Sequence, residues 1–499
     1  MLMTKIHVSY PPIDTGKGTP ALSQNRQFQY QSAESYIYPV VPASLATLLH
    51  SEGYEAVWDD GIAEKMSYDN WLKRISNSNP DIVFMETKTP TVKKHWKIIN
   101  QLKEELEGVK IVLMGDHVSA LPEESLSNSR VDYIMEGGEY DFKGLELAEY
   151  LSGKREKVPS GFYFQKEGKI AYSGHSVESF ELDNLPFIDL NLTKWRLYSE
   201  LNGNYKYRPG IHTMFGRDCW YRNGGGCTFC SWTVLYPKFS LISVDRALDE
   251  VGYLIDNYGV KEIFDDTGTF PPGDWLKKFN EGMVERGYNK EVKIGCNMRV
   301  GVLSSDEYVS MKKAGFRFIL YGIESANQRS LDLLNKSVKA EEQFNSIKMA
   351  SDAGLDPHIT VMFGYPWETK QEVLKTLKLG TDLIKKQYAK TWQVTIVIPY
   401  PGTKLFKQAQ ENRWLLTEDW DEYDMRKPVM STPLSSREIM EIVKDFYGAA
   451  YSPEFIMRRI INIRSMDDIK YLFFGLKKVI GYRENFSPDQ VNGFSAVTE

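Results

Sequence analysis

Three of the four cysteines lie close together, at Cys219, Cys227 and Cys230. Seven residues separate the first pair and two separate the second. Three thiolates this close can converge on one metal centre, one fewer than the four ligands of a closed site. An iron–sulfur cluster held by them would keep one iron open for a ligand that is not protein. Three glycines, residues 224–226, let the backbone turn close to such a centre.

Two other uses of these cysteines have to be weighed. Disulfides are disfavoured, because four cysteines in 499 residues without a secretory signal indicate a reducing compartment. A structural zinc site needs a fourth ligand, and the nearest histidine, His212, lies upstream in a predicted strand. The cysteines alone therefore favour a three-thiolate cluster and leave zinc open.

The composition is that of a large globular enzyme, with 42% hydrophobic residues, 26% charged residues and a net charge of −6. A net acidic chain without a long basic run does not predict nucleic-acid binding. No apolar run approaches the ~20 residues that cross a bilayer, so no transmembrane segment is expected. The N-terminus has no signal-peptide pattern, and we predict a cytoplasmic protein.

Residues 1–155 alternate short β-rich runs with helical stretches, which predicts an α/β domain with a doubly wound, Rossmann-like parallel sheet. The expected strands are Lys5–Ser9, Glu55–Trp58, Ile82–Glu86, Ile111–Gly115 and Tyr133–Met135, and the expected helices are Pro42–Gly53, Ser67–Asn77, Val92–Leu106, Pro122–Leu126 and Phe142–Ser152. No Gly-x-Gly-x-x-Gly follows the first strand, which argues against a dinucleotide site.

Ligands of such sheets bind beyond the carboxyl ends of the strands. The residues expected there are Pro11, Pro12, Thr87, Thr89, Gly115, Asp116, His117, Glu136, Gly137 and Gly138. Their small side chains and hydroxyls could let a flat, amide-rich ligand lie on the backbone, but they also suit the turns that any such sheet needs. A single loop histidine such as His117 is more typical of a surface or hydrogen-bonding residue than of a metal ligand.

Residues 156–204 are predicted to be a linker with a hairpin over Phe162–Tyr172, and residues 205–430 resume the βα rhythm. The expected strands are Ile211–Phe215, Glu262–Asp265, Val292–Met298, Arg317–Tyr321, His358–Phe363 and Thr391–Ile398, separated by helices. About six βα units predict a partial (β/α)6 TIM-like barrel rather than the full eight. The cysteine loop follows the first strand and so lies on the rim where barrels gather their chemistry.

Polar groups follow the other strands on that rim. They include Asp265, Asn297, Arg299, Glu324, Ser325 and Gly364. A ligand with an amine, a carboxylate and a ribose would find partners among them. Each one is common in loops, but their coincidence with an open cysteine triad favours a cofactor site. Cys296, within the third strand, is most simply a small buried residue; the alternative is a thiol that faces the pocket.

Residues 431–499 are predicted to be a C-terminal helical cap, with helices at Ser435–Tyr451 and Pro453–Tyr482. The second is amphipathic and locally basic. We interpret it as a cover on the open side of the barrel, with a surface for a lipid-like substrate as the alternative. The tail after Asn485 is polar and expected to be loose.

Residues 205–405 resemble the radical S-adenosylmethionine (radical SAM) superfamily. The resemblance rests on the order of four motifs: Cys227-Thr-Phe229-Cys230, Gly322-Ile-Glu-Ser325, Gly364-Tyr-Pro-Trp-Glu368 and Pro401-Gly-Thr403. The first domain, with Pro11-Pro12, Gly115-Asp-His117 and Glu136-Gly-Gly-Glu139, looks like the cobalamin-binding domain of the cobalamin-dependent branch.

The resemblance implies a [4Fe–4S] cluster on the three cysteines, S-adenosylmethionine on the open iron, and cobalamin on the first domain. Phe229 is then expected near the adenine, and Asp265, Arg299, Glu324 and Ser325 near the amino, carboxylate or ribose groups. The implied activity is reductive cleavage of S-adenosylmethionine and methylation of an unactivated carbon of a small-molecule or lipid-like substrate. The electron would come from a donor such as flavodoxin or ferredoxin.

Two alternatives stay open. One is a radical SAM enzyme that oxidises, cyclises or rearranges its substrate, with or without cobalamin; the other is a non-catalytic iron–sulfur or zinc protein. Two departures from the family pattern bear on them. The first two cysteines are usually three residues apart rather than seven, and the Asp-x-His-x-x-Gly signature for a cobalt-binding histidine is absent, because Val-Ser-Ala follows His117.

Overall fold

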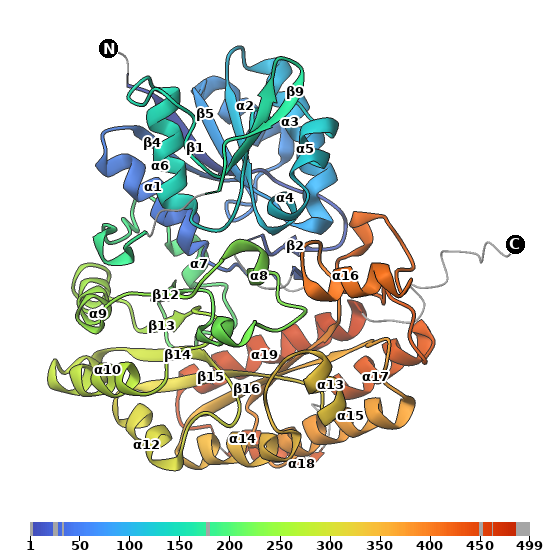
Figure 1. Cartoon of the computed structure of the whole chain (residues 1–499). Helices are drawn as coiled ribbons and strands as arrows, with labels where there is room; N and C mark the ends of the chain where they lie inside the picture. The colour runs from blue at the N-terminus through green and yellow to red at the C-terminus, as the bar shows by residue number, and fades with distance from the viewer. Residues whose placement is uncertain are drawn as a thin grey trace, which may run out of the picture.

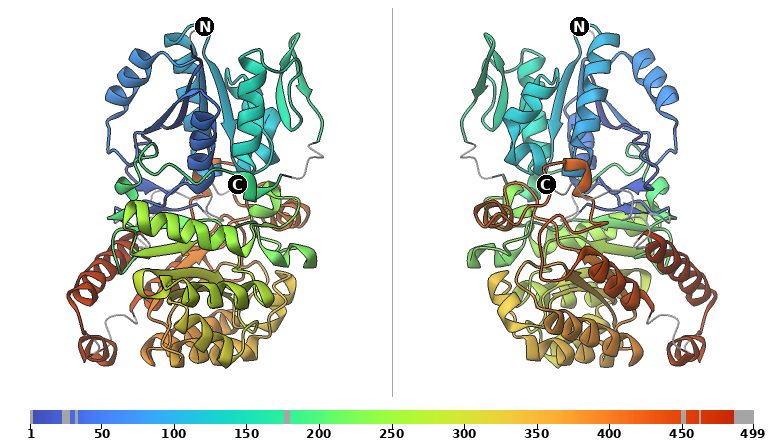
Figure 2. Two further views of the ribbon diagram at one scale, coloured as in Figure 1. Left: turned by 90° about the vertical axis from the view of Figure 1, so that its left-hand side faces the viewer. Right: turned by 90° about the vertical axis from the view of Figure 1, so that its right-hand side faces the viewer.

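The computed structural model describes residues 3–22, 28–31, 34–175, 180–448, 453–461 and 463–485. Two α/β units are stacked one on the other, and helices from the C-terminal part of the chain lie against the side of the lower unit (Figures 1 and 2). We call the upper unit the N-terminal unit and the lower one the half-barrel. The α/β class, the two sheets and the helical C-terminus agree with the expectation from the sequence.

The N-terminal unit is a seven-stranded sheet of order β4-β1-β5-β6-β7-β8-β9. Its strands are β1 (Lys5–Tyr10), β4 (Glu55–Asp60), β5 (Ile82–Glu86), β6 (Lys110–Met114), β7 (Tyr133–Met135), β8 (Phe162–Lys166) and β9 (Lys169–Tyr172). The first five are parallel, and the hairpin β8–β9 continues the sheet in antiparallel pairing with β7. β5 is buried along its whole length, as expected for a parallel strand covered on both faces.

Helices cover both faces of this sheet, which makes it doubly wound (Figure 1). They are α1 (Val40–Ser51), α2 (Tyr68–Ser78), α3 (Val92–Glu105), α4 (Asp116–Ala120), α5 (Pro122–Asn128) and α6 (Tyr140–Leu151), with a 3-10 turn at Thr89–Thr91. A short antiparallel pair, β2 (Thr19–Pro20) and β3 (Tyr30–Gln31), stands apart from the sheet. His117 was expected on a loop, as a surface or hydrogen-bonding residue; it lies in α4 instead, where it is buried and hydrogen-bonded to Thr89 and Glu124.

The half-barrel is a six-stranded parallel sheet of order β10-β13-β14-β15-β16-β17. Its strands are β10 (Gly210–Thr213), β13 (Glu262–Asp265), β14 (Lys293–Met298), β15 (Phe316–Glu324), β16 (Asp356–Phe363) and β17 (Thr391–Ile396). The helices that follow them are α9 (Val244–Tyr258), α10 (Asp274–Glu285), α11 (Tyr288–Glu291), α12 (Ser305–Lys313), α13 (Gln328–Leu333), α14 (Gln343–Asp352), α15 (Lys370–Lys385) and α16 (Lys404–Glu411). β10 and β17 do not pair, so the barrel stays open on one side.

The remaining elements are short or C-terminal. They are α7 (Arg196–Ser199), α8 (Trp232–Leu235), the pair β11 (Gly216–Arg217) and β12 (Ser240–Leu241), 3-10 turns at Leu182–Asn184, Trp220–Gly224, Ala340–Glu342 and Trp420–Glu422, and helices α17 (Ser436–Gly448), α18 (Pro453–Ile461) and α19 (Met466–Asn485). Among the described residues, no helix combines the length and apolar character needed to cross a bilayer.

The prediction of one helix over Pro453–Tyr482 was wrong, because α18 and α19 are separate. The second helix has its own start signal: the Ser465 side chain accepts from the backbone N–H of Asp468, whose carboxylate accepts from the Ser465 N–H. This reciprocal pair is a capping box, which ends one helix and begins another. The predicted helix end over residues 449–451 and the tail after Asn485 lie outside the described residues.

The half-barrel packs on the N-terminal unit directly through the segments around the cysteine loop. Arg217 donates to the Asp141 carboxylate over 2.7 Å, and both side chains are buried. The Gly138 N–H donates to the Leu235 carbonyl, and a Cβ on Gly138 would lie 2.6 Å from the Tyr236 ring. The loop after β7 is therefore fixed against the segment that follows the cysteines.

A buried carboxyl group in the N-terminal unit predicts a pH effect. Burial raises the pKa of Glu86 to about 7, although Lys88 counteracts it, and Tyr10 donates to Glu86 over 2.6 Å. At pH values between the pKa of this carboxyl in the unfolded chain and about 7, Glu86 keeps its proton in the folded protein but loses it in the unfolded chain. The free energy of unfolding therefore falls as the pH rises through this range. Glu86→Gln removes this loss, and its stability relative to wild type should rise from pH 5 to pH 8 by on the order of 2–3 kcal/mol.

Urea unfolding of the cofactor-free protein at both pH values measures this difference. Parallel pH profiles for the two proteins would show that the Glu86 carboxyl is not protonated in the folded state.

Candidate active site

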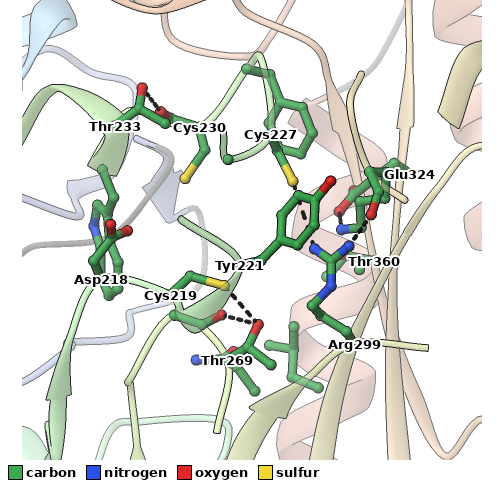
Figure 3. A pocket seen from close by; sticks show the side chains of 18 of the residues that line it. Asp218, Cys219, Tyr221, Cys227, Cys230, Thr233, Thr269, Arg299, Glu324 and Thr360 are labelled. Atoms are coloured by element: carbon green, nitrogen blue, oxygen red, sulfur yellow. Dashed lines mark hydrogen bonds and ion pairs between the residues drawn. The ribbon is translucent and has the colours of Figure 1, made fainter. Parts of the chain in front are cut away.

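The three cysteines of the loop after β10 line one cavity, which we call the thiol cavity. Figure 3 shows their sulfur atoms directed toward a common space. The Cys219 sulfur lies 3.3 Å from the Thr269 hydroxyl, and the two residues form a β-bridge. Gly268 permits this approach, because a Cβ there would lie 2.7 Å from the Asp218 carbonyl oxygen. The first cysteine is thus fixed to the loop that follows β13.

The seven residues between the first two cysteines have a defined conformation. Trp220–Gly224 form a 3-10 turn, and the Asn335 side-chain amide donates to the carbonyls of Gly224 and Gly226 over 3.0 and 2.8 Å. The extra residues therefore fold back and return Cys227 to the cavity that Cys219 lines.

The zinc alternative lacks its expected fourth ligand at this site. His212 does not line the thiol cavity; its Nδ1 is hydrogen-bonded to the Tyr205 hydroxyl. Burial lowers the pKa of His212 to about 3, so the ring is neutral. Among the described residues, no group of three Cys, His, Asp or Glu side chains is placed to hold a single metal ion.

A cation stands beside the thiols. Arg299 lies with Nη1 3.9 Å from the Cys227 sulfur and its guanidinium 4.0 Å from the centre of the Tyr221 ring, and it donates to the Lys336 carbonyl. Three thiols around one space, with a cation at their edge, therefore fit an iron–sulfur cluster bound by three protein ligands.

A buried ion pair also lines the thiol cavity, close to Arg299, which donates to the Lys336 carbonyl. Lys336 donates to the Glu324 carboxylate over 2.6 Å, and both side chains line the cavity. Glu324 has a φ of +61°, and a Cβ on Gly322 would lie 2.2 Å from its carboxylate oxygen. Only glycine at 322 leaves room for this carboxylate. The Phe229 ring lies 5.9 Å from the Lys336 ammonium.

The structure brings together most, but not all, of the rim residues that the sequence singles out. Those that line the thiol cavity are Cys219, Cys227, Cys230, Phe229, Asn297, Arg299 and Glu324. Asp265 does not line it: the carboxylate accepts from the Phe215 N–H, and burial raises its pKa to about 7. Ser325 donates to the Glu368 carboxylate, and Gly364 packs near Ile439.

Further residues of the thiol cavity carry no sequence signal that would have found them. They are Gln29, Tyr221, Thr269, Lys336, Thr360, Gln393 and Met425. They come from separate strands and loops, so only the tertiary fold places them together. Cys296 does not line the cavity; it is fully buried in β14, where burial raises the pKa of its thiol, as expected for a structural cysteine.

Several residues at the carboxyl edge of the N-terminal sheet are hydrogen-bonded to one another or packed closely together. The Thr87 hydroxyl lies 2.7 Å from His95 Nδ1, and a Cβ on Gly115 would lie 2.1 Å from the Thr87 carbonyl oxygen. His117 has both ring nitrogens engaged, by Thr89 at 3.2 Å and Glu124 at 3.1 Å. This histidine is therefore not presented as a free metal ligand.

The other residues singled out at this edge differ in their surroundings. Pro12 packs where a Cβ on Gly61 would stand, and Asp116 accepts from Lys88 over 3.1 Å. Glu136 accepts from the Tyr172 hydroxyl over 2.5 Å. Two carboxylate oxygens, Glu86 Oε1 and Glu139 Oε2, are buried without a hydrogen-bond partner among the described residues. Burial raises the pKa of both carboxyls to about 7, so these oxygens can pair with the amide groups of a ligand, as donors when protonated and as acceptors when charged.

The Radical SAM superfamily profile matches residues 214–380, a range that contains the cysteine triad, Arg299 and Glu324. Residues 214–380 are a radical SAM domain. The expectation of a radical SAM enzyme is thereby confirmed, and the non-catalytic alternative is disfavoured. The three cysteines of the thiol cavity lie within this domain, whereas Gln29, Gln393 and Met425 of its lining lie outside it.

The similarity to known proteins extends beyond the radical SAM domain. An uncharacterised methyltransferase of Pyrococcus horikoshii is 28% identical over 85% of this chain and 90% of its own. The anaerobic magnesium-protoporphyrin IX monomethyl ester cyclase of Rubrivivax gelatinosus is 24% identical over 82% of this chain and 73% of its own. The solved structure of the radical SAM methyltransferase TsrM from Kitasatospora setae, with cobalamin and a [4Fe–4S] cluster bound, covers 96% of this chain and all of its own at 13% identity and a TM-score of 0.66. The TsrM likeness confirms the fold, with both sheets.

Proposed function

We propose that the protein is a cobalamin-dependent radical SAM enzyme that cleaves S-adenosylmethionine reductively and methylates an unactivated carbon of a small-molecule or lipid-like substrate. The observation that carries this proposal is the convergence of the three thiols on one cavity within the radical SAM domain. Cys219, Cys227 and Cys230 would hold a [4Fe–4S] cluster, which when bound supplies the electron that cleaves the sulfonium.

The chain's own charged groups suit the amino-acid part of S-adenosylmethionine. Glu324 can accept from the amino group, and Arg299 can donate to the carboxylate. Tyr221 supports the Arg299 guanidinium through its ring face. Phe229 and Asn297 line the same cavity and offer an aromatic face and an amide for the nucleoside. Asp265 and Ser325 act through other residues, by fixing the backbone at 215 and the carboxylate of Glu368.

Cobalamin would bind between the N-terminal unit and the half-barrel, and when bound it supplies the methyl group. The buried carboxyl oxygens of Glu86 and Glu139 that lack a partner among the described residues support this proposal, as does the TsrM-like arrangement of both sheets. Because Thr89 and Glu124 engage His117, we propose that the histidine does not ligate the cobalt. The use of flavodoxin or ferredoxin as electron donor and the cytoplasmic location stay predictions.

The products of S-adenosylmethionine distinguish methylation from other radical chemistry. With the true substrate and a reductant, a methylase should consume two S-adenosylmethionine molecules per turnover and release S-adenosylhomocysteine together with 5′-deoxyadenosine. Chromatography of an anaerobic reaction measures both. Formation of 5′-deoxyadenosine alone would reject methylation.

The second candidate is oxidation, cyclisation or rearrangement. It is favoured by the relative that is named a cyclase, and 5′-deoxyadenosine as the only product would support it.

A further inference from the structure

Helices α18 and α19 cover the open side of the half-barrel. Asp468, in α19, accepts from Lys206, which precedes the first barrel strand, over 2.5 Å. Phe455, in α18, meets Trp392 of the last strand edge-on, with ring centres 5.5 Å apart. The two helices therefore connect the edges of the sheet at β10 and β17, which do not pair with each other. Figure 2 shows these dark red helices against the side of the half-barrel.

A second cavity, of about 360 Å³, lies between these helices and the start of β16 and β17; we call it the cap cavity. Its walls are mainly apolar, with Trp392, Phe455, Ile460, Tyr471, Leu472 and Leu476 among them. The outer surface of the same helices also carries exposed apolar side chains, Met457 and Phe473 included. Ile456, Ile460 and Leu476 line the cavity and are also exposed, so an apolar ligand would meet apolar surface where the cavity opens as well as inside it.

The cap cavity continues toward the thiol cavity along one face of the sheet. Alternate residues of a strand share a face. On β16, His358 lines the cap cavity and Thr360 lines the thiol cavity; on β17, Thr391 lines the first and Gln393 lines both. The Gln393 side chain donates to Gln29 over 2.8 Å and stands at the junction of the two cavities.

The cap cavity contains more positive than negative free charge. Its lining includes Arg459 and Lys390, and within the described residues the Lys390 ammonium donates to the Gln387 carbonyl and forms no ion pair. The carboxylate in the lining, Asp468, is already paired with Lys206. Arg459 Nε is buried without a hydrogen-bond acceptor in the described part of the chain, and its guanidinium lies 5.1 Å from the Phe455 ring centre. A half-buried guanidinium whose Nε has no acceptor, in a mainly apolar cavity, favours an anionic ligand.

We propose that the cap cavity binds the substrate of the enzyme and that this substrate is an acidic amphiphile, with a carboxylate or phosphate on Arg459 and a hydrocarbon body that extends past Gln393 to the thiol cavity. Lys390, the second cation of the lining, comes three residue steps before Gln393, and three steps along an extended strand span about 10 Å. An acidic group held at the Lys390 end of the cap cavity would therefore lie at least about 10 Å from a carbon at the thiol cavity. The binding of the amphiphile is independent of catalysis, whereas its role as substrate rests on the proposed function.

Calorimetric titration of the purified full-length protein with dodecanoate, dodecyl phosphate and dodecanol tests the site. Loss of a hydrogen bond to a charged group weakens binding by about tenfold or more. We expect at least one of the two anions to bind about tenfold more tightly than the alcohol, and Arg459→Ala to abolish that preference. Arg437→Ala, an exposed residue of α17 that pairs with Glu441, is the matched control and should keep it.

Equal binding of anions and alcohol by the wild type, or an unchanged preference in Arg459→Ala, would overturn the proposal. Leu472→Trp, which fills the cap cavity, should weaken binding of all three probes by about tenfold or more, with the far-ultraviolet spectrum and urea midpoint checking that the variant folds. Undiminished binding would place the probes elsewhere. The proposed function is tested by a different measurement. It fails if the wild-type protein forms no 5′-deoxyadenosine, and this result does not depend on the titrations.

Discussion

Cys227→Ala, reconstituted anaerobically with iron and sulfide, is expected to lose the visible absorbance of a [4Fe–4S] cluster and to form 5′-deoxyadenosine only at the level of a protein-free control. The reason is that the thiol cavity provides three protein thiols for the cluster. Removal of one leaves two thiols to hold four irons. The Cys227 sulfur also lies 3.9 Å from Arg299 Nη1, at the edge of the space that the three thiols share. Absorbance, iron content and product formation measure the effect.

Cys296→Ala is the matched control. Its sulfur is buried in β14 and does not line the thiol cavity, so the cluster spectrum and S-adenosylmethionine cleavage should be those of the wild type. An unchanged spectrum in Cys227→Ala, or loss of the cluster in Cys296→Ala, would contradict the ligand assignment.

The second large effect is expected on stability, from Arg317→Met. Arg317 is buried and donates to Glu262 over 2.8 Å and to Asp356 over 3.1 Å, which joins β13, β15 and β16 near their starts. The other oxygen of Glu262 accepts from the N–H groups of Lys206 and Tyr207, so the pair also fixes the segment that leads into β10. Methionine would leave the Glu262 charge buried and unpaired, at a cost of about 3–5 kcal/mol.

Urea unfolding of the cofactor-free protein measures this loss. The double variant Arg317→Met with Glu262→Gln should recover part of the stability, because no buried charge is then left alone. Arg437→Met, at an exposed pair on α17, should change stability by less than about 0.5 kcal/mol. A loss equally small in Arg317→Met would show that the Glu262 carboxyl is not charged in the folded protein.

The sequence could predict what depends on local pattern. Alternating β-rich and helical runs predicted both parallel sheets, since strand and helix periods are set by neighbouring residues. The spacing of Cys219, Cys227 and Cys230, together with the later motifs, predicted the radical SAM domain. The single helix predicted over 453–482 was wrong, because its amphipathic pattern outweighed the capping box at Ser465 and Asp468.

Only the tertiary structure decided which rim residues share the thiol cavity. Asp265 and Glu324 are both the last residues of barrel strands, yet Asp265 accepts from the backbone of the neighbouring segment, whereas Glu324 lines the thiol cavity beside Lys336. The direction of a side chain at a strand end depends on packing, which a one-dimensional pattern does not contain. The same holds for Gln393 and Arg459, which lie far apart in the chain and line one cap cavity because α18 and α19 fold across the open side of the half-barrel.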